Sequence, residues 1–409
     1  MPRYLQVAPT VAAMPGDVYS SFAGRITSYR GEIYPLHLGD TWLDPAPGCR
    51  LEDLRLAENP GMYRYPAAQG LPVLLEAIVE RERAKTGVSI GPENLLVGAG
   101  ATGALSAVVG ALVQPGDEVL LLAPYWPLFA GTVRIFHGVP VAVPFFGEVD
   151  SKEAAVAAVA ARLSPRTAVL YINTPNNPTG RVIPRPWMEA LVEWAAAEGL
   201  WVISDEVYDH YVFRGEHVYG LQLLPERTFV AQSFSKAYGM AGNRCGYVIG
   251  PRSVMPELKK ISVNNFYSAP NGAQLAARRV LGPVGDAWVE TARRSYRVTG
   301  DRIAERLGVA PPESSMFLFI DVADWLDGRG LQGFLEDCAD RGLLLAPGPS
   351  FGPYPTHVRL CYTATSPEVV ERGVEVFASM IGRGAATAGS ALGSSGVGGR
   401  SAMAAASRR

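Results

Sequence analysis

The sequence predicts an α/β protein in which a doubly wound, mostly parallel sheet forms a large domain and a smaller α+β domain is built from both chain ends. The chain has 409 residues, which is more than one small core accommodates, so a second domain is expected. Up to Ile249, short apolar runs bounded by Gly, Pro and Asn alternate with segments of helical periodicity. Beyond Ile249 this rhythm of strands breaks, which indicates the smaller domain.

Six apolar runs are predicted to be strands of the large domain. They cover residues 94–97, 117–122, 167–172, 200–204, 228–231 and 246–249. Periodic apolar positions predict helices over 73–83 and 104–113. In an open α/β sheet, ligands bind beyond the carboxyl ends of the strands, so the residues that directly follow these runs are the candidates for a functional site.

The remaining elements are predicted mostly in the smaller domain. Helices are expected over 274–280, 286–307 and 331–341, strands over 34–38, 316–321 and 358–361, and a strand and loop over 343–352. We divide the chain into an N-terminal segment that joins the small domain (1–50), a large domain (51–285), a small domain (286–382) and a tail (383–409). The tail is mostly Ala, Gly and Ser with scattered Arg, a composition typical of disorder.

The bulk composition limits the class of partner. The formal net charge is −2 and 19% of the residues are charged, so we expect a small-molecule partner and neither nucleic acid nor an anionic membrane. The four cysteines, Cys49, Cys245, Cys338 and Cys361, form no CxxC pair, which predicts reduced cysteines without a metal in a cytoplasmic protein. We find neither the apolar core of a signal peptide nor the roughly 18 apolar residues of a membrane span.

Lys236 is the first candidate for catalysis. It lies in the run Ser233-Phe-Ser-Lys-Ala-Tyr-Gly239, just past a predicted strand. A lysine amine whose pKa is lowered by burial or by a nearby cation can form a Schiff base with a carbonyl cofactor, whereas most lysines are exposed surface residues. The hydroxyls of Ser233 and Ser235 and the planar guanidinium of Arg244 favour the first interpretation, because they suit a phosphate group.

This motif resembles the cofactor-lysine signature of the class I and II aminotransferases, which are pyridoxal-phosphate enzymes of fold type I. The shared features are Ser-x-Ser-Lys, an Arg eight positions after the Lys, and a Gly two positions further on. The resemblance covers roughly residues 30 to 380. It implies pyridoxal 5'-phosphate as cofactor, carried on Lys236, with an amino acid and a 2-oxo acid as substrates.

A phosphate cradle is predicted where a strand, a small-residue turn and a helix follow one another. Gly100, Ala101 and Thr102 lie in the turn that leads into the helix, where free N–H groups and the Thr102 hydroxyl favour an anion. A tight turn without a ligand is the alternative.

Trp126 follows the next strand and offers a flat face to a planar ring. The resemblance implies that Trp126 stacks on the cofactor, and packing in a core or an interface is the alternative.

Three polar residues at strand ends complete the predicted cofactor site. Asp205 would be the counter-ion that keeps a pyridine nitrogen protonated, and Tyr208 would donate to the phenolic oxygen of the ligand. Asp205 precedes Lys236 by 31 residues, about one βαβ unit, so both should emerge at one sheet edge. The resemblance implies that Asn177, in the run Asn-Pro-Thr-Gly, binds the ring oxygen and the substrate carboxylate. A solvated acid at a strand end and a plain turn are the alternatives.

Contacts to the substrate and to a second subunit follow from the resemblance. Arg359 lies among apolar residues of a predicted strand, where a guanidinium needs an anionic partner. In the family the matching arginine binds the substrate α-carboxylate, and a protein aspartate is the alternative. Gly39 matches a glycine beside the substrate, or is only a turn residue.

Tyr65 matches a tyrosine that reaches the cofactor phosphate of the neighbouring subunit, which implies a homodimer with shared active sites. Packing beside Pro66 is the alternative.

The same cofactor and fold support more than one reaction. We adopt amino-group transfer between an L-amino acid and a 2-oxo acid, with Lys236 as the base. A lyase, decarboxylase or cyclase is the alternative, because the fold does not determine which bond breaks. A cofactor-sensing regulator would carry a DNA-binding domain, yet only about 30 residues precede the first predicted strand. The pocket is expected to favour an uncharged substrate side chain, and its predicted lining is Phe22, Ile33, Trp42 and Thr102.

Overall fold

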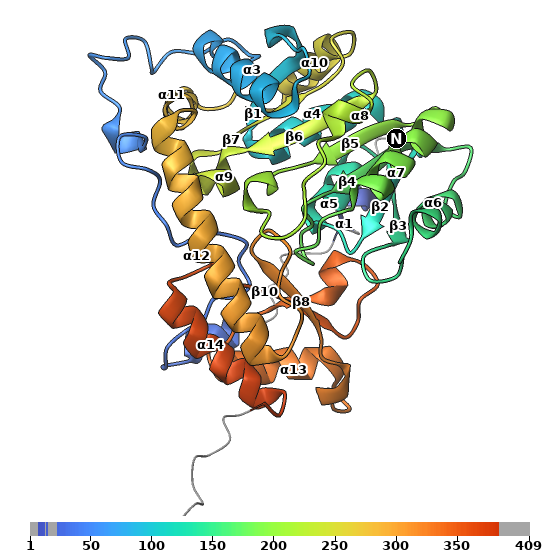
Figure 1. Ribbon diagram of the computed structural model, residues 1–409, viewed down its shortest axis with the longest axis vertical. Coiled ribbons are helices and arrows are strands. Elements are labelled where there is room, and N and C mark those ends of the chain that lie inside the picture. Colours follow the sequence, from blue (N-terminus) through green and yellow to red (C-terminus); the bar gives the residue numbers. More distant parts are fainter. Residues whose placement is uncertain (1–6, 13, 15–22, 384–409) are drawn as a thin grey trace, which may run out of the picture.

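The computed structural model describes residues 7–12, 14 and 23–383 (Figure 1). Phe22 and all of the predicted disordered tail except Arg383 lie outside the described residues. Two sheets organise the described chain, one of seven strands and one of three. Within this part of the chain, no helix is long and apolar enough to cross a membrane.

The large sheet is mostly parallel, which confirms the predicted fold class. Its strands lie in the order β1-β7-β6-β5-β4-β2-β3, and only β7 runs antiparallel to its neighbours. The strands are β1 (Leu95–Ala99), β2 (Glu118–Ala123), β3 (Val139–Pro144), β4 (Thr167–Asn173), β5 (Trp201–Asp205), β6 (Thr228–Ser233) and β7 (Cys245–Ile249). β5 and β6 lie side by side near the middle, so Asp205 and Lys236 emerge at the same edge, as predicted.

Helices cover both faces of this sheet because side chains along its buried strands alternate between two apolar cores. Leu121 and Ile203 face α4, α5 and α10, whereas Leu120 and Val202 face α6 and α7. α3 and α11 pack over the β1–β7 end. The helices are α3 (Pro72–Thr86), α4 (Gly100–Leu112), α5 (Pro127–Ile135), α6 (Lys152–Ala160), α7 (Arg185–Ala197), α8 (Gly220–Leu223), α9 (Phe234–Ala237), α10 (Met255–Asn265) and α11 (Asn271–Val280).

The small sheet is antiparallel, in the order β8-β10-β9, and packs against the C-terminal helices. The long helix α12 runs from the large sheet down to this part of the molecule (Figure 1). The N-terminal segment joins it, because Tyr34 pairs with Leu343 and Leu36 is buried in the same core. The elements are α1 (Pro9–Ala12), α2 (Ala23–Ser28), α12 (Pro283–Leu307), α13 (Gly330–Ala339), α14 (Pro367–Met380), β8 (Phe317–Asp321), β9 (Ala346–Pro347) and β10 (His357–Cys361). The domain boundaries themselves stay a prediction.

The structure departs from the predicted elements in several places, and the helices α5, α6, α7 and α10 were not predicted. The helix expected from residue 104 already begins at Gly100, whose positive φ of 72° lets the chain turn directly from β1 into α4. The edge strand β3 was missed, because it contains two prolines and is largely half-exposed. The strand expected at 34–38 reduces to a single bridge between Tyr34 and Leu343, and the strand and loop expected over 343–352 contain only the two-residue β9.

Candidate active site

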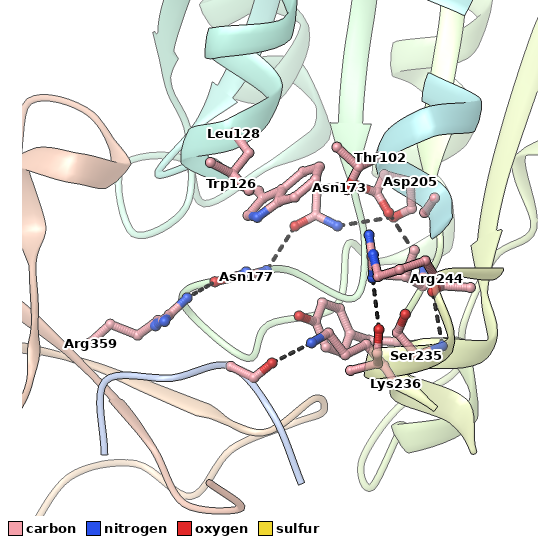
Figure 2. A pocket seen from close by; sticks show the side chains of 16 residues that line it. Thr102, Trp126, Leu128, Asn173, Asn177, Asp205, Ser235, Lys236, Arg244 and Arg359 are labelled. Carbon is pink, nitrogen blue, oxygen red and sulfur yellow. Dashed lines mark hydrogen bonds between the residues drawn. The ribbon is translucent and has the colours of Figure 1, made fainter. Parts of the chain in front are cut away.

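A cavity of about 280 Å³ lies beyond the carboxyl ends of β4, β5 and β6, between the large sheet and β10 (Figure 2). It brings together twelve of the fourteen site residues that the sequence predicts. They are Gly39, Ala101, Thr102, Trp126, Asn177, Asp205, Tyr208, Ser233, Ser235, Lys236, Arg244 and Arg359. Ile33 and Trp42, two of the expected side-chain contacts, do not line this cavity, and Trp42 packs on Tyr296 with ring centroids 5.7 Å apart.

The other two predicted residues lie outside the cavity lining. Gly100 stands directly behind it, and a Cβ at this position would come within 2.6 Å of Arg244 Nη2. Its lack of a side chain therefore gives the guanidinium room. Tyr65 is 86% exposed, and its ring contacts Tyr267 with centroids 5.1 Å apart. It makes no contact with the cavity of its own protomer.

Lys236 lies in the short helix α9, which begins directly after β6. Its Nζ donates a hydrogen bond to the carbonyl oxygen of Gly39 in the N-terminal segment. Burial lowers the pKa of this amine, the guanidinium groups of Arg359 and Arg244 lower it further, and Asp40 opposes the shift. A lowered pKa increases the fraction of neutral, nucleophilic amine, which is what Schiff-base chemistry and proton abstraction require.

Asp205 is the last residue of β5 and is 2% exposed. Burial raises its pKa to about 6, although hydrogen bonds from Tyr171 and from the Val207 backbone oppose the shift. The Tyr171 hydroxyl donates to Oδ2 at 2.6 Å, and the Val207 N–H lies 3.4 Å from Oδ1. The carboxylate is therefore fixed at the cavity floor and is short of positive partners, so a cationic ligand group would stabilise it.

Arg359 on β10 is held in a planar, buried arrangement. Nη1 donates to Asn177 Oδ1 at 2.9 Å, and Nη2 donates to the carbonyl oxygen of His37 at 2.6 Å. The guanidinium also contacts the rings of Phe317 and Phe351, with its carbon 4.5 and 4.9 Å from their centroids. Nε has no hydrogen-bond partner among the described residues. A guanidinium fixed in this way and partly unsatisfied is suited to a carboxylate ligand.

Asn173 lines the cavity but was not predicted as a site residue. Its Oδ1 accepts the N–H of Asn177 at 2.8 Å, and its Nδ2 donates to the backbone oxygen of Asp205 at 3.1 Å. Asn173 thus joins the ends of β4 and β5, a role that its place at the end of a predicted strand could have indicated. Tyr208, by contrast, was predicted, and burial raises its pKa, so its hydroxyl remains protonated and can donate.

One end of the cavity is built for an anion. The first turn of α4 presents Ala101 and Thr102 there. The β7 backbone passes so close that a Cβ at Gly246 would meet Ala101 N at 2.5 Å. Arg244 adopts a left-handed conformation, with φ at 52°, and donates from Nη1 to the carbonyl oxygen of Ala241 at 2.9 Å. Helix N–H groups and a guanidinium together are a phosphate-binding arrangement.

Comparison with known proteins decides the family. Residues 35–377 match the family described as aminotransferase class I and II. The chain belongs to this family. This aminotransferase moves an amino group between an amino acid and a 2-oxo acid, and members of its class generally depend on pyridoxal phosphate.

Curated relatives of the aminotransferase act on different amino acids. It is 34% identical over 344 residues to the aspartate/prephenate aminotransferase of Thermus thermophilus, a match that covers 81% of this chain and 87% of the relative. It is 35% identical over 346 residues to the arginine–pyruvate transaminase of Pseudomonas aeruginosa, covering 80% of this chain and 85% of the relative. The reaction type is therefore shared, while the side chain of the substrate varies.

The fold of the aminotransferase agrees with solved structures of the same class. The Thermus thermophilus aspartate aminotransferase with maleate superposes with a TM-score of 0.84 at 31% identity, over 92% of this chain and 100% of that chain. A Thermotoga maritima aspartate aminotransferase superposes with a TM-score of 0.81 at 26% identity, over 92% and 100% of the two chains. The architecture of fold type I, predicted from the sequence, is confirmed.

Proposed function

We propose that this aminotransferase works with pyridoxal 5'-phosphate bound in the cavity beyond β4, β5 and β6. One observation carries the proposal: the cavity lining combines three basic side chains, Lys236, Arg244 and Arg359, with a single carboxylate, Asp205. A phosphate ester with a pyridinium ring, together with an amino-acid carboxylate, would balance these charges. The anion-binding turn at α4 supports the same fit, because it lies at the Arg244 end of the cavity.

The proposed cofactor contacts rest on residues of the cavity lining and on Gly100 directly behind it. The phosphate would be held by the first turn of α4, by Arg244 and by the serine hydroxyls, and the ring would stack on Trp126. Asp205 would bind the ring nitrogen, while Tyr208 and Asn177 would bind the phenolic oxygen. The proposed phosphate contacts are Gly100, Ala101, Thr102, Ser233, Ser235 and Arg244.

Lys236 is the proposed base of the reaction. When bound, pyridoxal phosphate supplies an aldehyde that condenses with amines and a protonated ring that accepts electrons from the substrate Cα. Lys236 Nζ, with its pKa lowered by burial, would take the proton from Cα and hold it for return. Asp205 would keep the ring nitrogen protonated, because its buried carboxylate is stabilised by a cationic partner.

Arg359 and Asn177 would orient the substrate. The guanidinium is already fixed by Asn177, by His37 and by two aromatic rings, so a carboxylate can bind it without reorganising the side chain. Gly39 stands beside this group, and a Cβ there would lie 3.9 Å from Arg359 Nη1 and 3.0 Å from the Phe317 ring. The backbone at Gly39 can thus lie close to the substrate.

The substrate side chain is proposed to be uncharged. All three cations of the described cavity lining have a task in the cofactor or the α-carboxylate site, and none of the other described lining residues is basic. Leu128, which is 59% exposed, and Val207 add apolar surface at this site. We therefore expect neutral amino acids to be better substrates than aspartate.

The active enzyme is proposed to be a homodimer in which Tyr65 reaches the cofactor phosphate of the partner subunit. Tyr63 and Tyr65 are 82% and 86% exposed, and Tyr267 beside them is 42% exposed. Large aromatic rings left this accessible are typical of a surface that another chain covers. The shared-site arrangement would give the exposed phenol of Tyr65 a partner.

An absorbance titration tests the proposal. The purified protein, supplied with pyridoxal phosphate, should show a visible band that shifts to shorter wavelength when a good amino-acid substrate is added. A 2-oxo acid should then restore the band. A panel with aspartate, arginine and neutral amino acids identifies the substrate class. A protein that binds no pyridoxal phosphate would contradict the proposed cofactor, and a preference for aspartate would contradict the proposed side chain.

A further inference from the structure

Tyr171 lies beneath the active site, in the core of the large sheet. It is 1% exposed and stands on β4, where its register partner on β5 is Ile203. The partner of Asp205 in the same pair of strands is Asn173. Because alternate residues of a strand point to the same face, Tyr171, Asn173 and Asp205 share one face of the sheet. Tyr171 therefore approaches Asp205 from two residues deeper in the core.

The Tyr171 hydroxyl makes its hydrogen bond directly to the carboxylate. It lies 2.6 Å from Asp205 Oδ2, and both side chains are buried. Burial raises the pKa of Tyr171 well above its usual value, so the phenol stays protonated and donates. The contact is thus a charge-assisted hydrogen bond from a fixed donor, which is stronger than a bond between neutral groups.

The ring of Tyr171 is held in place by α5. It stacks on Phe129 with ring centroids 3.7 Å apart and an angle of 10° between the planes. Phe129 lies in the first turn of α5, and Trp126, which lines the cavity, directly precedes this helix. Packing in α5 therefore fixes both the proposed stacking face and the donor beneath Asp205.

We propose that Tyr171 is a positioning residue for the cofactor: its hydroxyl holds Asp205 ionised and aimed at the ring nitrogen. This inference rests on the proposed binding of pyridoxal phosphate. Oδ2 is occupied by Tyr171, and the second oxygen, Oδ1, has only the Val207 N–H at 3.4 Å within the described chain. Oδ1 is thus the oxygen left to a cationic ring N–H. Tyr171 is expected to act on the cofactor only by way of Asp205. Removing its hydroxyl should therefore weaken the bond between Asp205 and the ring nitrogen and leave the other cofactor contacts unchanged.

The test compares two ligands on Tyr171→Phe, which removes one oxygen and keeps the ring. The ligands are pyridoxal phosphate and its analogue with a CH group in place of the ring nitrogen, titrated into cofactor-free protein by tryptophan fluorescence. We expect Tyr171→Phe to lower the affinity for pyridoxal phosphate by about tenfold, the usual loss when a hydrogen bond to a charged group is removed. The affinity for the analogue, which offers Asp205 no ring N–H, should change less than twofold.

Two further variants separate positioning from a general loss of packing. Asp205→Asn should lower the affinity for pyridoxal phosphate, and adding Tyr171→Phe to it should cause little further loss, since the two residues act as one unit. Tyr362→Phe is the matched control, because it removes a buried phenol that donates to the Ser315 oxygen at 3.0 Å, remote from Asp205. It should leave both affinities unchanged.

The outcomes distinguish this inference from the proposed cofactor. If Tyr171→Phe weakens both ligands equally, or neither, Tyr171 does not act through the ring nitrogen and the inference is overturned. If the unaltered protein binds neither ligand, the proposed cofactor itself is wrong. Thermal unfolding of each cofactor-free variant, measured alongside, shows whether any loss of affinity comes from loss of the fold.

Discussion

At the scale of single residues, Asp205 illustrates how a binding site lowers the stability of its own fold. Its carboxyl pKa rises from the usual 3.8 to about 6 because burial disfavours the charged form. The folded state therefore binds more protons than the unfolded state between these pH values, and this group destabilises the fold as the pH rises through that window. Above about pH 6 the full cost, at most about 3 kcal/mol, is present.

Replacing Asp205 with Asn should stabilise the cofactor-free protein while impairing function. The amide keeps the shape and can still accept from Tyr171, but it carries no buried charge. We expect a gain of about 1–3 kcal/mol at pH 7.5 that disappears near pH 4, and a 10- to 100-fold loss of affinity for pyridoxal phosphate. Denaturant unfolding at both pH values and a cofactor titration measure the two effects. Equal stability of both proteins at pH 7.5 would contradict the raised pKa.

Lys236 provides the second prediction at this scale. Lys236→Ala should remove the visible absorbance of the bound cofactor and lower kcat by about 10⁴-fold or more, because both the covalent anchor and the base are lost. Lys260→Ala is the control, since Lys260 lies on the exposed surface of α10, where its amine pairs with Glu257. That variant should keep the band and the activity. If the Lys236→Ala protein kept the normal spectrum, the aldehyde of the cofactor would be bound to a different amine, and the role proposed for Lys236 would be wrong.

Single residues were predictable from sequence where local chemistry and strand ends coincide. Asp205 directly follows an apolar run, and Lys236 and Asn177 stand in the polar segments that follow two others, so their shared edge could be inferred without coordinates. The partners of these residues could not be inferred. Tyr171 looks like an ordinary aromatic strand residue, and only the register between β4 and β5 brings it to Asp205.

At the scale of elements, the entry into α4 combines backbone conformation with ligand binding. Gly100 has φ at 72°, and a Cβ there would press on Arg244 Nη2 at 2.6 Å. Gly100→Ala should cost about 1–2 kcal/mol of stability and lower the affinity for pyridoxal phosphate by about tenfold or more through displacement of Arg244. Unfolding curves and cofactor titrations measure both quantities.

The chain offers a matched control for this substitution. Gly87, at the end of α3, has φ at 71°, yet a Cβ there would meet nothing within 4 Å. Gly87→Ala should show a similar loss of stability without any change in cofactor affinity. If both variants lose affinity equally, the effect comes from reduced stability and not from crowding of Arg244.

Element boundaries show where local patterns stop being informative. Apolar periodicity located most of the strands of the large sheet and the helices α3, α4 and α11, because those segments are buried and regular. It did not locate α5, α6, α7 or α10. It failed at β3, an edge strand with a weakly buried pattern, and at β9, whose pairing depends on β10 rather than on its own residues. Short elements are determined by neighbours that are distant in the sequence.

At the scale of the whole molecule, the cavity is closed by contacts between distant parts of the chain. Lys236 donates to Gly39, and Arg359 donates to Asn177 and to His37. The sequence predicted Lys236, Gly39, Arg359 and Asn177 as part of the site, but not His37, and the pairings depend on how the N-terminal segment and β10 pack against the large sheet. Only the three-dimensional arrangement supplies those pairings.

Assembly gives the last prediction, because Tyr65 is too exposed to serve its own cavity. If it binds the cofactor phosphate of the partner, Tyr65→Ala should weaken pyridoxal phosphate about tenfold in a homodimer. In a hybrid dimer of one Tyr65→Ala and one Lys236→Ala subunit, the only lysine-containing site receives an intact Tyr65 from the other subunit. That site should bind the cofactor with normal affinity and be active. Weak binding at that site would show that Tyr65 acts within its own subunit. Light scattering should also find a dimer, and a monomer would contradict the shared site.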